Sequence, residues 1–229
     1  MNDENPGRAL RADARLNREQ IIEAARALIT ERGPEVPMEE VARRAGVGAA
    51  TLYRRFPDRE ALVRGVALDG FHRVVAIARD AEDEEPDAWR ALSRFVHRAA
   101  AELRLATWLS IWFAGTWERL HAEPEEQRLR RTLLRILDRL VRRAQADGDL
   151  RDDVDAGDLT MMTALLLRPL PGPRAELTQR GVDRYLTLML EGLRAHPGIR
   201  PLPDGDVDLT DIGLTGPRPS GSAGQGGEK

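Results

Sequence analysis

The sequence of 229 residues contains no cysteine. Disulfide bonds and thiolate metal sites are therefore excluded, and because this composition fits a reducing compartment we expect a cytoplasmic protein. The sequence also lacks an apolar run near the roughly 18 residues that a membrane-spanning helix needs. Residues 1–14 are polar, which argues against a secretory signal peptide. No membrane is expected among the partners of this chain.

A strong excess of charge of either sign is also missing. The formal net charge is −3, so the chain as a whole is not a basic coat for nucleic acid. Residues 1–57 hold ten arginines against nine acidic residues, whereas the remainder of the chain is acidic. For nucleic-acid binding, it therefore matters whether the arginines of this first part gather on one face.

Alternating strand patterns are absent from the sequence and β-branched residues are sparse, whereas apolar residues recur at helical spacing. This pattern predicts an all-α fold. Capping residues, prolines and glycines divide the chain into nine expected helices. Their approximate ranges are 17–32, 38–45, 49–56, 58–80, 87–103, 105–120, 124–147, 155–167 and 175–194.

The two ends of the chain are expected to lie outside this helical body. Asn17 is a favourable N-cap, and Leu16 and Ile21 are spaced for a hydrophobic staple, so the first helix should begin there. Residues 1–16 would form a flexible basic arm, which either enters a DNA minor groove or is a solvated tail. Three arginines carry its charge: Arg8, Arg11 and Arg15. Residues 196–229 are rich in glycine, proline, serine and aspartate, which predicts a disordered tail.

Residues 41–56 have the pattern of a helix-turn-helix, in which two short helices meet at a tight turn. Ala45 offers the small contact that a steep crossing needs, and Gly46 can adopt the positive φ of the turn. Leu52 and Phe56 are four residues apart, so they share the inward face of the second helix. The remaining side chains of this helix would face outward, and they are of types that reach bases and phosphates: Thr51, Tyr53, Arg54 and Arg55. The alternative is that both helices are ordinary core helices of a bundle.

Three consecutive segments, Ala45–Gly48, Thr51–Phe56 and Pro57–Leu62, resemble the DNA-binding domain of the TetR family of bacterial repressors. The resemblance runs from about Asn17 to about Leu62. Further along, the segment 184–194 resembles the last helix of an SbtR-like subgroup. The resemblance implies a helix-turn-helix domain over residues 17–62, followed by a helical effector-binding and dimerisation domain over residues 63–195.

The same resemblance implies which residues contact DNA. The start of the second helix would face bases in the major groove, through Ala49, Ala50 and Thr51. Phosphates would be held by Tyr53, by Arg59 and by the N-terminus of the preceding helix at Met38. Gly48 stands where the family often has a hydroxyl residue, so it supplies no side-chain oxygen for a phosphate contact. The full set of expected DNA contacts is Met38, Arg43, Arg44, Gly48, Ala49, Ala50, Thr51, Tyr53, Arg54, Arg55 and Arg59.

An aromatic cluster over residues 105–120 suggests a small-molecule pocket. Trp108 and Trp112 are four residues apart and share a helix face. Aromatic rings can line an apolar pocket, although such a stripe is more often filled core. The resemblance favours the pocket, because TetR-like regulators bind effectors in this region. The expected effector-binding residues are Phe95, Trp108, Trp112, Phe113 and Met162, with Met161 as a further neighbour.

The last two helices, 155–167 and 175–194, are too apolar to lie on the surface of a lone subunit. By resemblance, they would form a four-helix homodimer interface with the same helices of a second copy. The side chains expected to contribute are Leu159, Met162, Leu165, Leu166, Tyr185, Met189 and Leu193. The alternative is that one of these helices is central to its own subunit.

Patterns typical of enzymes fail on inspection. Gly46-Val47-Gly48 starts like a dinucleotide fingerprint, but Thr51 occupies the place of the third glycine and no strand precedes it. The four histidines lack metal-ligand spacing, and no serine lies in a nucleophile elbow. We therefore expect no catalytic residue, no metal and no cofactor.

The sequence thus predicts a TetR-like regulator that is not an enzyme. It would act as a repressor, bind a palindromic double-stranded DNA operator as a homodimer and be released by a small-molecule effector. Two alternatives stay open at this point: a DNA-binding recruitment module with no effector, and a helical enzyme that uses the aromatic pocket.

Overall fold

A computed structural model describes residues 6–168 and 175–203 of the chain. These residues form nine α-helices, and their only β pairing is an isolated antiparallel bridge between Leu150 and Arg194. The helices are α1 (Pro6–Arg32), α2 (Met38–Arg44), α3 (Ala49–Arg55), α4 (Arg59–Glu84), α5 (Ala88–Trp112), α6 (Ala114–His121), α7 (Pro124–Ala146), α8 (Ala156–Leu166) and α9 (Ala175–Leu193). The prediction of an all-α fold is confirmed. Among the described helices, none has both the length and the apolarity that a bilayer crossing requires.

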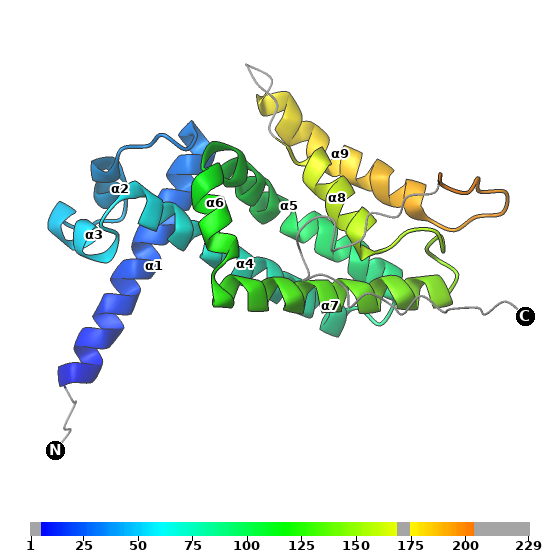
Figure 1. Ribbon diagram of the computed structural model, residues 1–229, viewed down its shortest axis with the longest axis horizontal. Helices are drawn as coiled ribbons and strands as arrows, with labels where there is room; N and C mark the ends of the chain where they lie inside the picture. The colour runs from blue at the N-terminus through cyan, green and yellow to red at the C-terminus, as the bar shows by residue number, and fades with distance from the viewer. Residues whose placement is uncertain (1–5, 169–174, 204–229) are drawn as a thin grey trace, which may run out of the picture.

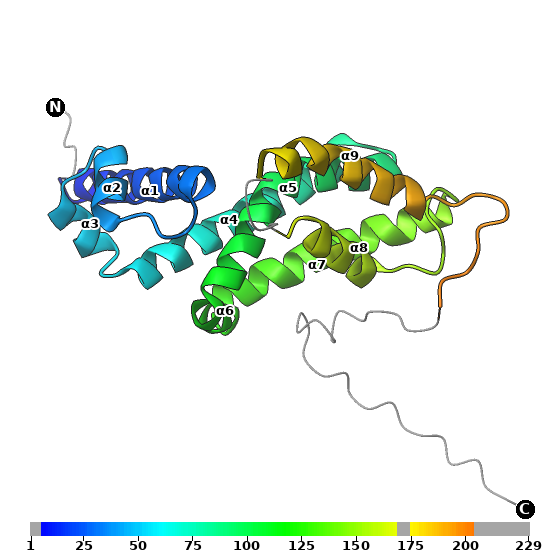
Figure 2. The ribbon, with the colours of Figure 1, turned by 90° about the horizontal axis from the view of Figure 1, so that it is seen from above.

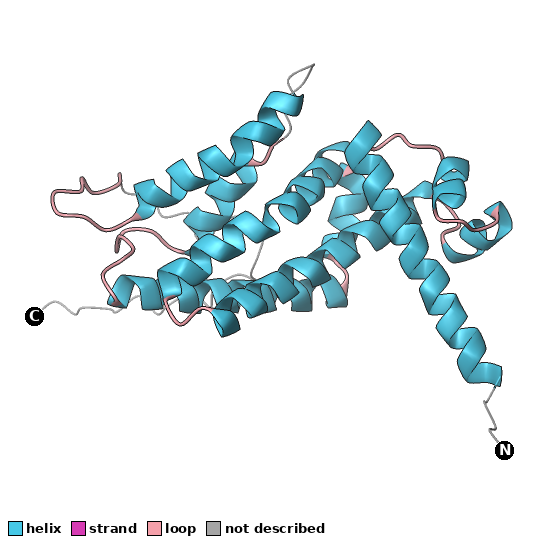
Figure 3. Cartoon of the chain, turned by 180° about the vertical axis from the view of Figure 1, so that it is seen from behind, coloured by secondary structure: helices cyan, strands magenta, loops and turns pink. Residues whose placement is uncertain are grey.

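The helices form two groups joined by α4 (Figures 1 and 2). Helices α1, α2 and α3 gather at one end of the molecule, and α5 to α9 build the larger body at the other end. Seen from behind, the long helices of the body run side by side, and α1 projects away from them (Figure 3). Helix α4 starts at the capping residue Asp58, whose carboxylate accepts from the Ala61 N–H at 2.7 Å. Its N-terminal half belongs to the small group and its C-terminal half to the body.

The hydrophobic core is divided in the same way. One cluster fills the small group and contains α1 residues such as Ile21 and Leu28, together with Leu52 and Phe56 of the α3 segment. Leu52 is fully buried, which contributes roughly 1.5–3 kcal/mol of transfer free energy. This cluster also contains three side chains from outside the small group: Leu105, Leu109 and Leu120. The second half of α5 and helix α6 therefore pack directly on the core of the N-terminal domain.

Two expected helix boundaries are wrong. Helix α1 begins at Pro6, so Asn17 lies inside it and Leu16 is exposed rather than stapled to Ile21. The expected flexible arm is therefore replaced from Pro6 onward by helix, because the local capping signal at Asn17 does not end a helix that neighbouring residues can continue. Residues 1–5 lie outside the described part of the chain.

The expected break near residue 104 is also absent. Helix α5 runs without interruption to Trp112, and only the short α6 follows it. No proline or glycine stands between residues 103 and 105, so nothing in the sequence stops the helix there.

The beginning of the expected disordered tail is anchored to the body. The Leu202 N–H donates to the Asp153 carboxylate at 2.8 Å, and Arg151 donates to the Arg200 carbonyl at 3.0 Å. The Arg151 guanidinium and the Leu202 N–H hold the pKa of Asp153 well below its usual value. Residues 196–203 are therefore held in place, and residues 204–229 lie outside the described part of the chain.

Candidate nucleic-acid interface and effector cavity

Helices α2 and α3 meet at the predicted turn. Gly46 has φ of +69°, the left-handed region that a residue with a Cβ avoids. The Val47 N–H donates to the Ala42 carbonyl at 3.0 Å and closes the turn after α2. Leu52 and Phe56 point into the core of the N-terminal domain. The sequence pattern and the geometry agree at each of these positions.

The opposite face of α3 lies open to solvent. Gly48, Ala49, Ala50, Arg54 and Arg55 are exposed, and Thr51 is half-buried. Tyr53 has 41% of its surface exposed. This arrangement argues against the alternative that α2 and α3 are ordinary core helices, because the open face of α3 carries small, hydroxyl and basic side chains that can reach a duplex.

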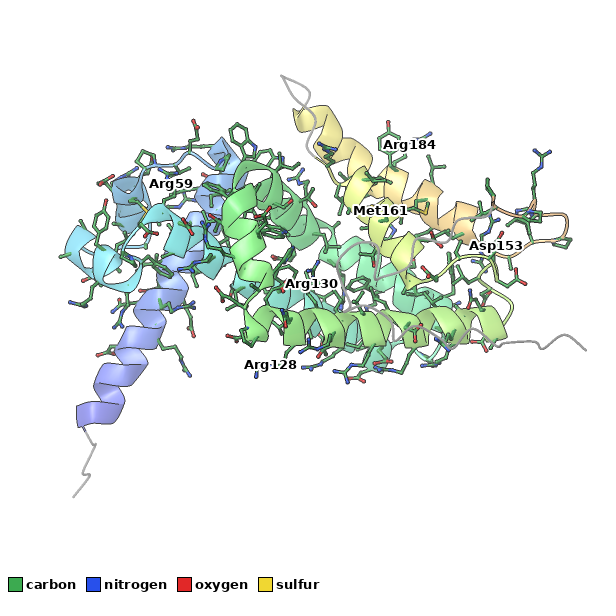
Figure 4. The ribbon with its side chains drawn as sticks, viewed as in Figure 1. Arg59, Arg128, Arg130, Asp153, Met161 and Arg184 are labelled. Atoms are coloured by element: carbon green, nitrogen blue, oxygen red, sulfur yellow. The ribbon has the colours of Figure 1, made fainter. Side chains whose placement is uncertain are left out.

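Several of the polar side chains expected at this face already have partners within the domain. The Tyr53 hydroxyl donates to the Glu39 carboxylate at 2.9 Å, and this hydrogen bond raises the pKa of Tyr53. Arg59, labelled in Figure 4, donates to the carbonyl of Pro34 in the loop after α1 at 2.9 Å. Arg43 pairs with Glu40 at 3.2 Å and Arg44 with Glu31 at 2.9 Å. A phosphate would have to compete with these internal partners.

Three further expected DNA contacts, Met38, Arg54 and Arg55, differ in how far their side chains reach solvent. The Met38 side chain is buried, with 8% of its surface exposed, so only its backbone at the start of α2 remains for a ligand. Arg54 and Arg55 have no ion pair among the described residues, so their charge is available at the exposed face without competition.

A cavity of about 250 Å³ lies within the body. Residues of α4, α5, α6, α7 and α8 line it, and it opens partly to solvent. Its lining residues are Phe71, Phe95, Leu103, Ala106, Thr107, Ser110, Trp117, Arg130, Leu133, Leu137, Leu159, Thr160, Thr163 and Ala164. The lining is mostly apolar and carries one charged side chain, which is the composition of a small-molecule site.

Of the residues expected to bind an effector, only Phe95 lines this cavity. Trp112 is 57% exposed and Met162 is 38% exposed, so both face solvent in the isolated subunit. Trp108, Phe113 and Met161 are half-buried and do not line the cavity. The structure therefore does not bring the expected aromatic side chains together in this cavity. Because α5 is continuous, its cavity-facing positions are 95, 103, 106, 107 and 110, and the helical repeat places 108 and 112 on another face.

The cavity residues that sequence reasoning missed include Phe71, Trp117 and Arg130. A signal for Arg130 was present in the sequence. Arg130 is three residues before Leu133 and seven before Leu137, so it falls on the apolar stripe of α7. A charged residue at such a position either pairs internally or faces a cavity. Phe71 and Trp117 carried no comparable signal, because their roles depend on how α4 and α6 cross.

Helices α8 and α9 bury part of the expected interface within the subunit. Leu159, Met189 and Leu193 belong to the core of the body, and Leu166 packs against that core. These four residues therefore pack within their own subunit and do not form the expected dimer surface. Among the residues of these helices whose side chains are described, four large apolar ones are exposed: Met162, Leu165, Tyr185 and Leu188.

The molecule thus combines a helix-turn-helix whose second helix is open to solvent with a helical body that contains a small-molecule-sized cavity. This combination defines a DNA-binding transcriptional regulator. Comparison with known proteins agrees with this class. The sequence profile of the bacterial regulatory proteins of the tetR family matches residues 21–66, and that of the C-terminal domain of SbtR-like transcriptional regulators matches residues 85–195. No match is found among curated proteins.

Solved structures lead to the same family. A TetR transcription regulatory protein from Mycobacterium vanbaalenii is 32% identical, with a TM-score of 0.59, over 81% of this chain and 99% of its own. A TetR transcriptional regulator from Streptomyces coelicolor is 28% identical, with a TM-score of 0.58, over 78% and 98% of the two chains. A ketosteroid transcriptional regulator from Mycobacterium tuberculosis shares the fold at 19% identity, with a TM-score of 0.54, over 78% and 95%. The chain belongs to the TetR family of transcriptional regulators, and the resemblance seen in its sequence is confirmed.

Proposed function

We propose that this regulator is a repressor that binds a palindromic operator as a homodimer and leaves it when a small molecule fills the body cavity. The exposed face of α3 carries the proposal. It presents small residues at its start, Ala49 and Ala50, and two arginines with free charge at its end, Arg54 and Arg55. Small side chains let a helix approach base edges closely, and arginines reach guanine or phosphate.

The homodimer is supported by the exposed apolar side chains on α8 and α9. Leu165 is 61% exposed, Leu188 is 57% exposed and Tyr185 is 54% exposed. Apolar side chains gathered on two neighbouring helices are typical of a protein interface. A second copy would cover them by twofold symmetry and would place two α3 helices about 34–36 Å apart on one face of DNA.

Release by an effector is supported by the position of α4. Its first residues pack in the core beneath α3, and Phe71 further along the same helix lines the cavity. A ligand that moves α4 changes the angle of the N-terminal domain and the distance between the two α3 helices. Such coupling is typically about 1–3 kcal/mol.

Purified protein tests the proposal directly. It is mixed with sheared genomic DNA, bound fragments are sequenced, and the enriched site is used in a binding assay with a small-molecule library. We expect one palindromic motif and loss of DNA affinity with at least one ligand. Specific DNA binding that no ligand changes would support a recruitment module instead. Turnover of a bound compound without specific DNA binding would support an enzyme.

A further inference from the structure

The polar groups of the cavity wall differ in what they can offer to a ligand. The hydroxyl groups of Thr107, Thr160 and Thr163 donate to carbonyls of their own helices at 2.7–2.8 Å, and Ser110 does the same at 2.8 Å. Their hydrogens are therefore already used, and these groups can only accept a hydrogen bond from a ligand. Arg130 is the one charged residue among the lining residues.

The Arg130 guanidinium is only partly satisfied by the protein. Its Nε lies 3.3 Å from Oε1 of Glu126, and 17% of the side chain is exposed. Neither of its terminal Nη groups has a hydrogen-bond partner among the described residues. Burial lowers the pKa of Arg130 and the charge of Glu126 opposes this shift, so the group stays a cation at neutral pH. Several strong donors therefore remain in a mostly apolar space.

The ion pair with Glu126 leaves part of the Arg130 guanidinium available to a second anion. Its side chain is fully buried, and the same Oε1 that faces Arg130 also lies 3.0 Å from Nδ1 of His121. The carboxylate is thus shared between two groups and meets Arg130 at its Nε edge only.

We infer that the cavity binds a small apolar carboxylic acid, with the carboxylate paired to the Nη groups of Arg130 and the hydrocarbon part against the aromatic and leucine walls. This inference rests on the proposed function, in which the cavity is the effector site. A carboxylate matches the planar fork of a guanidinium with two parallel hydrogen bonds, which a neutral amide cannot do. In Figure 4 Arg130 rises from α7 toward α5 and α6, whereas Arg128 of the same helix points away from the body.

The test compares acids with neutral compounds of nearly the same shape. Phenylbutyric acid with phenylbutyramide, and octanoic acid with octanamide, are titrated into the full-length protein by calorimetry. We expect the acid to bind roughly tenfold or more tightly than its amide, the difference that a charged bidentate pair contributes. Arg130→Gln should weaken the acids by a similar factor and leave the amides unchanged. The matched control Arg128→Gln should behave like the wild type, since Arg128 is exposed on the outer side of α7.

A second variant keeps the test decisive if Arg130→Gln fails to fold. Glu126→Gln retains the Arg130 charge and removes its internal competitor, so the acids should bind several-fold more tightly than to the wild type. Three results would overturn the inference. Amides could bind as well as acids, or the affinity of the acids could be the same for both variants as for the wild type. The third is a series of arylalkanoic and fatty acids that does not bind at millimolar concentration.

The outcome also separates this inference from the proposed function. If neutral compounds bind and release DNA while acids do not, the acid preference is wrong and the effector-controlled repressor stands. If acids bind through Arg130 and DNA affinity never changes, the cavity site stands and release by an effector is wrong.

Discussion

The rings of Phe71 in α4 and Trp117 in α6 pack against each other, with centroids 5.9 Å apart and an angle of 37° between their planes. Both rings line the cavity, and both also pack against the core cluster of the N-terminal domain. A molecule in the cavity therefore touches side chains that touch the core beneath α3. The rings of Trp117 and His121 pack edge to face, with centroids 5.3 Å apart. His121 and Arg130 both contact the Glu126 carboxylate.

Phe71→Ala should uncouple the cavity from DNA binding. Removal of the ring takes away the contact of α4 with the ligand, so DNA affinity without ligand should change little, while the ligand-induced loss should fall from about 1–3 kcal/mol to less than about 0.5 kcal/mol. Operator titrations by fluorescence anisotropy, with and without the ligand found in the screen, measure both quantities. Phe113→Ala is the matched control, because Phe113 packs on the same core but does not line the cavity. Equal loss of coupling in both variants would contradict this role of Phe71.

Tyr53→Phe and Thr51→Ala should differ in kind. Loss of the Tyr53 hydroxyl removes a phosphate contact, so affinity for all sequences should fall alike, by roughly three- to tenfold. We propose that Thr51 contacts the base edges, so Thr51→Ala should change which base is preferred at one position of the site. Selection from a randomised operator library measures affinity and preference together. Unselective losses of the same size in both variants would contradict the proposed placement of α3 on DNA.

Glu39→Gln should strengthen DNA binding. Glu39 is exposed, accepts from the Tyr53 hydroxyl in the free protein and adds negative charge beside the expected phosphate contacts. The neutral amide accepts a weaker hydrogen bond from Tyr53 and reduces the repulsion of phosphate, so affinity should rise several-fold for specific and random DNA alike, most at low salt. Anisotropy titrations at several salt concentrations measure this change. An unchanged affinity at low salt would show that Glu39 does not compete with phosphate.

Leu188→Glu should separate the proposed dimer. The side chain is 57% exposed on α9, and a charge there would be buried without a partner in a two-copy interface. We expect monomers in sedimentation experiments and a large loss of operator affinity, since one half-site alone binds weakly. Leu202→Glu provides the control, because Leu202 is 45% exposed but lies outside α8 and α9. A Leu188→Glu protein that remains dimeric would place the interface elsewhere.

Glu102→Gln should destabilise the whole protein. The Glu102 carboxylate in α5 accepts from both terminal nitrogens of Arg26 in α1, at 2.5 and 2.6 Å, and both side chains are nearly buried. Removal of one partner leaves a poorly solvated charge, so the free energy of unfolding should fall by about 3 kcal/mol. Urea denaturation measures this loss. Arg142→Gln, which breaks an exposed pair with Asp138, should cost less than about 1 kcal/mol.

The N-terminal domain was largely predictable because its information is local. The spacing of Leu52 and Phe56, the turn at Gly46 and the cap at Asp58 lie within one short stretch of chain. Each acts over a few residues, through helical periodicity, a permitted φ or a single hydrogen bond. The same local reasoning failed at Asn17, because a good cap does not prevent a helix from continuing through it.

The sequence by itself determined the all-α class, the helix-turn-helix and its outward face. Only the tertiary structure decided which aromatic rings line the cavity: Trp117 does and Trp112 does not. It also decided that Arg130 is the charged residue among the lining residues. Leu159 and Met189 show the same limit, since an apolar helix does not reveal whether its side chains cover their own subunit or a second copy. The physical reason is that these outcomes depend on the crossing of helices distant in sequence, and the rotation of one helix against another is determined by packing and not by any local pattern.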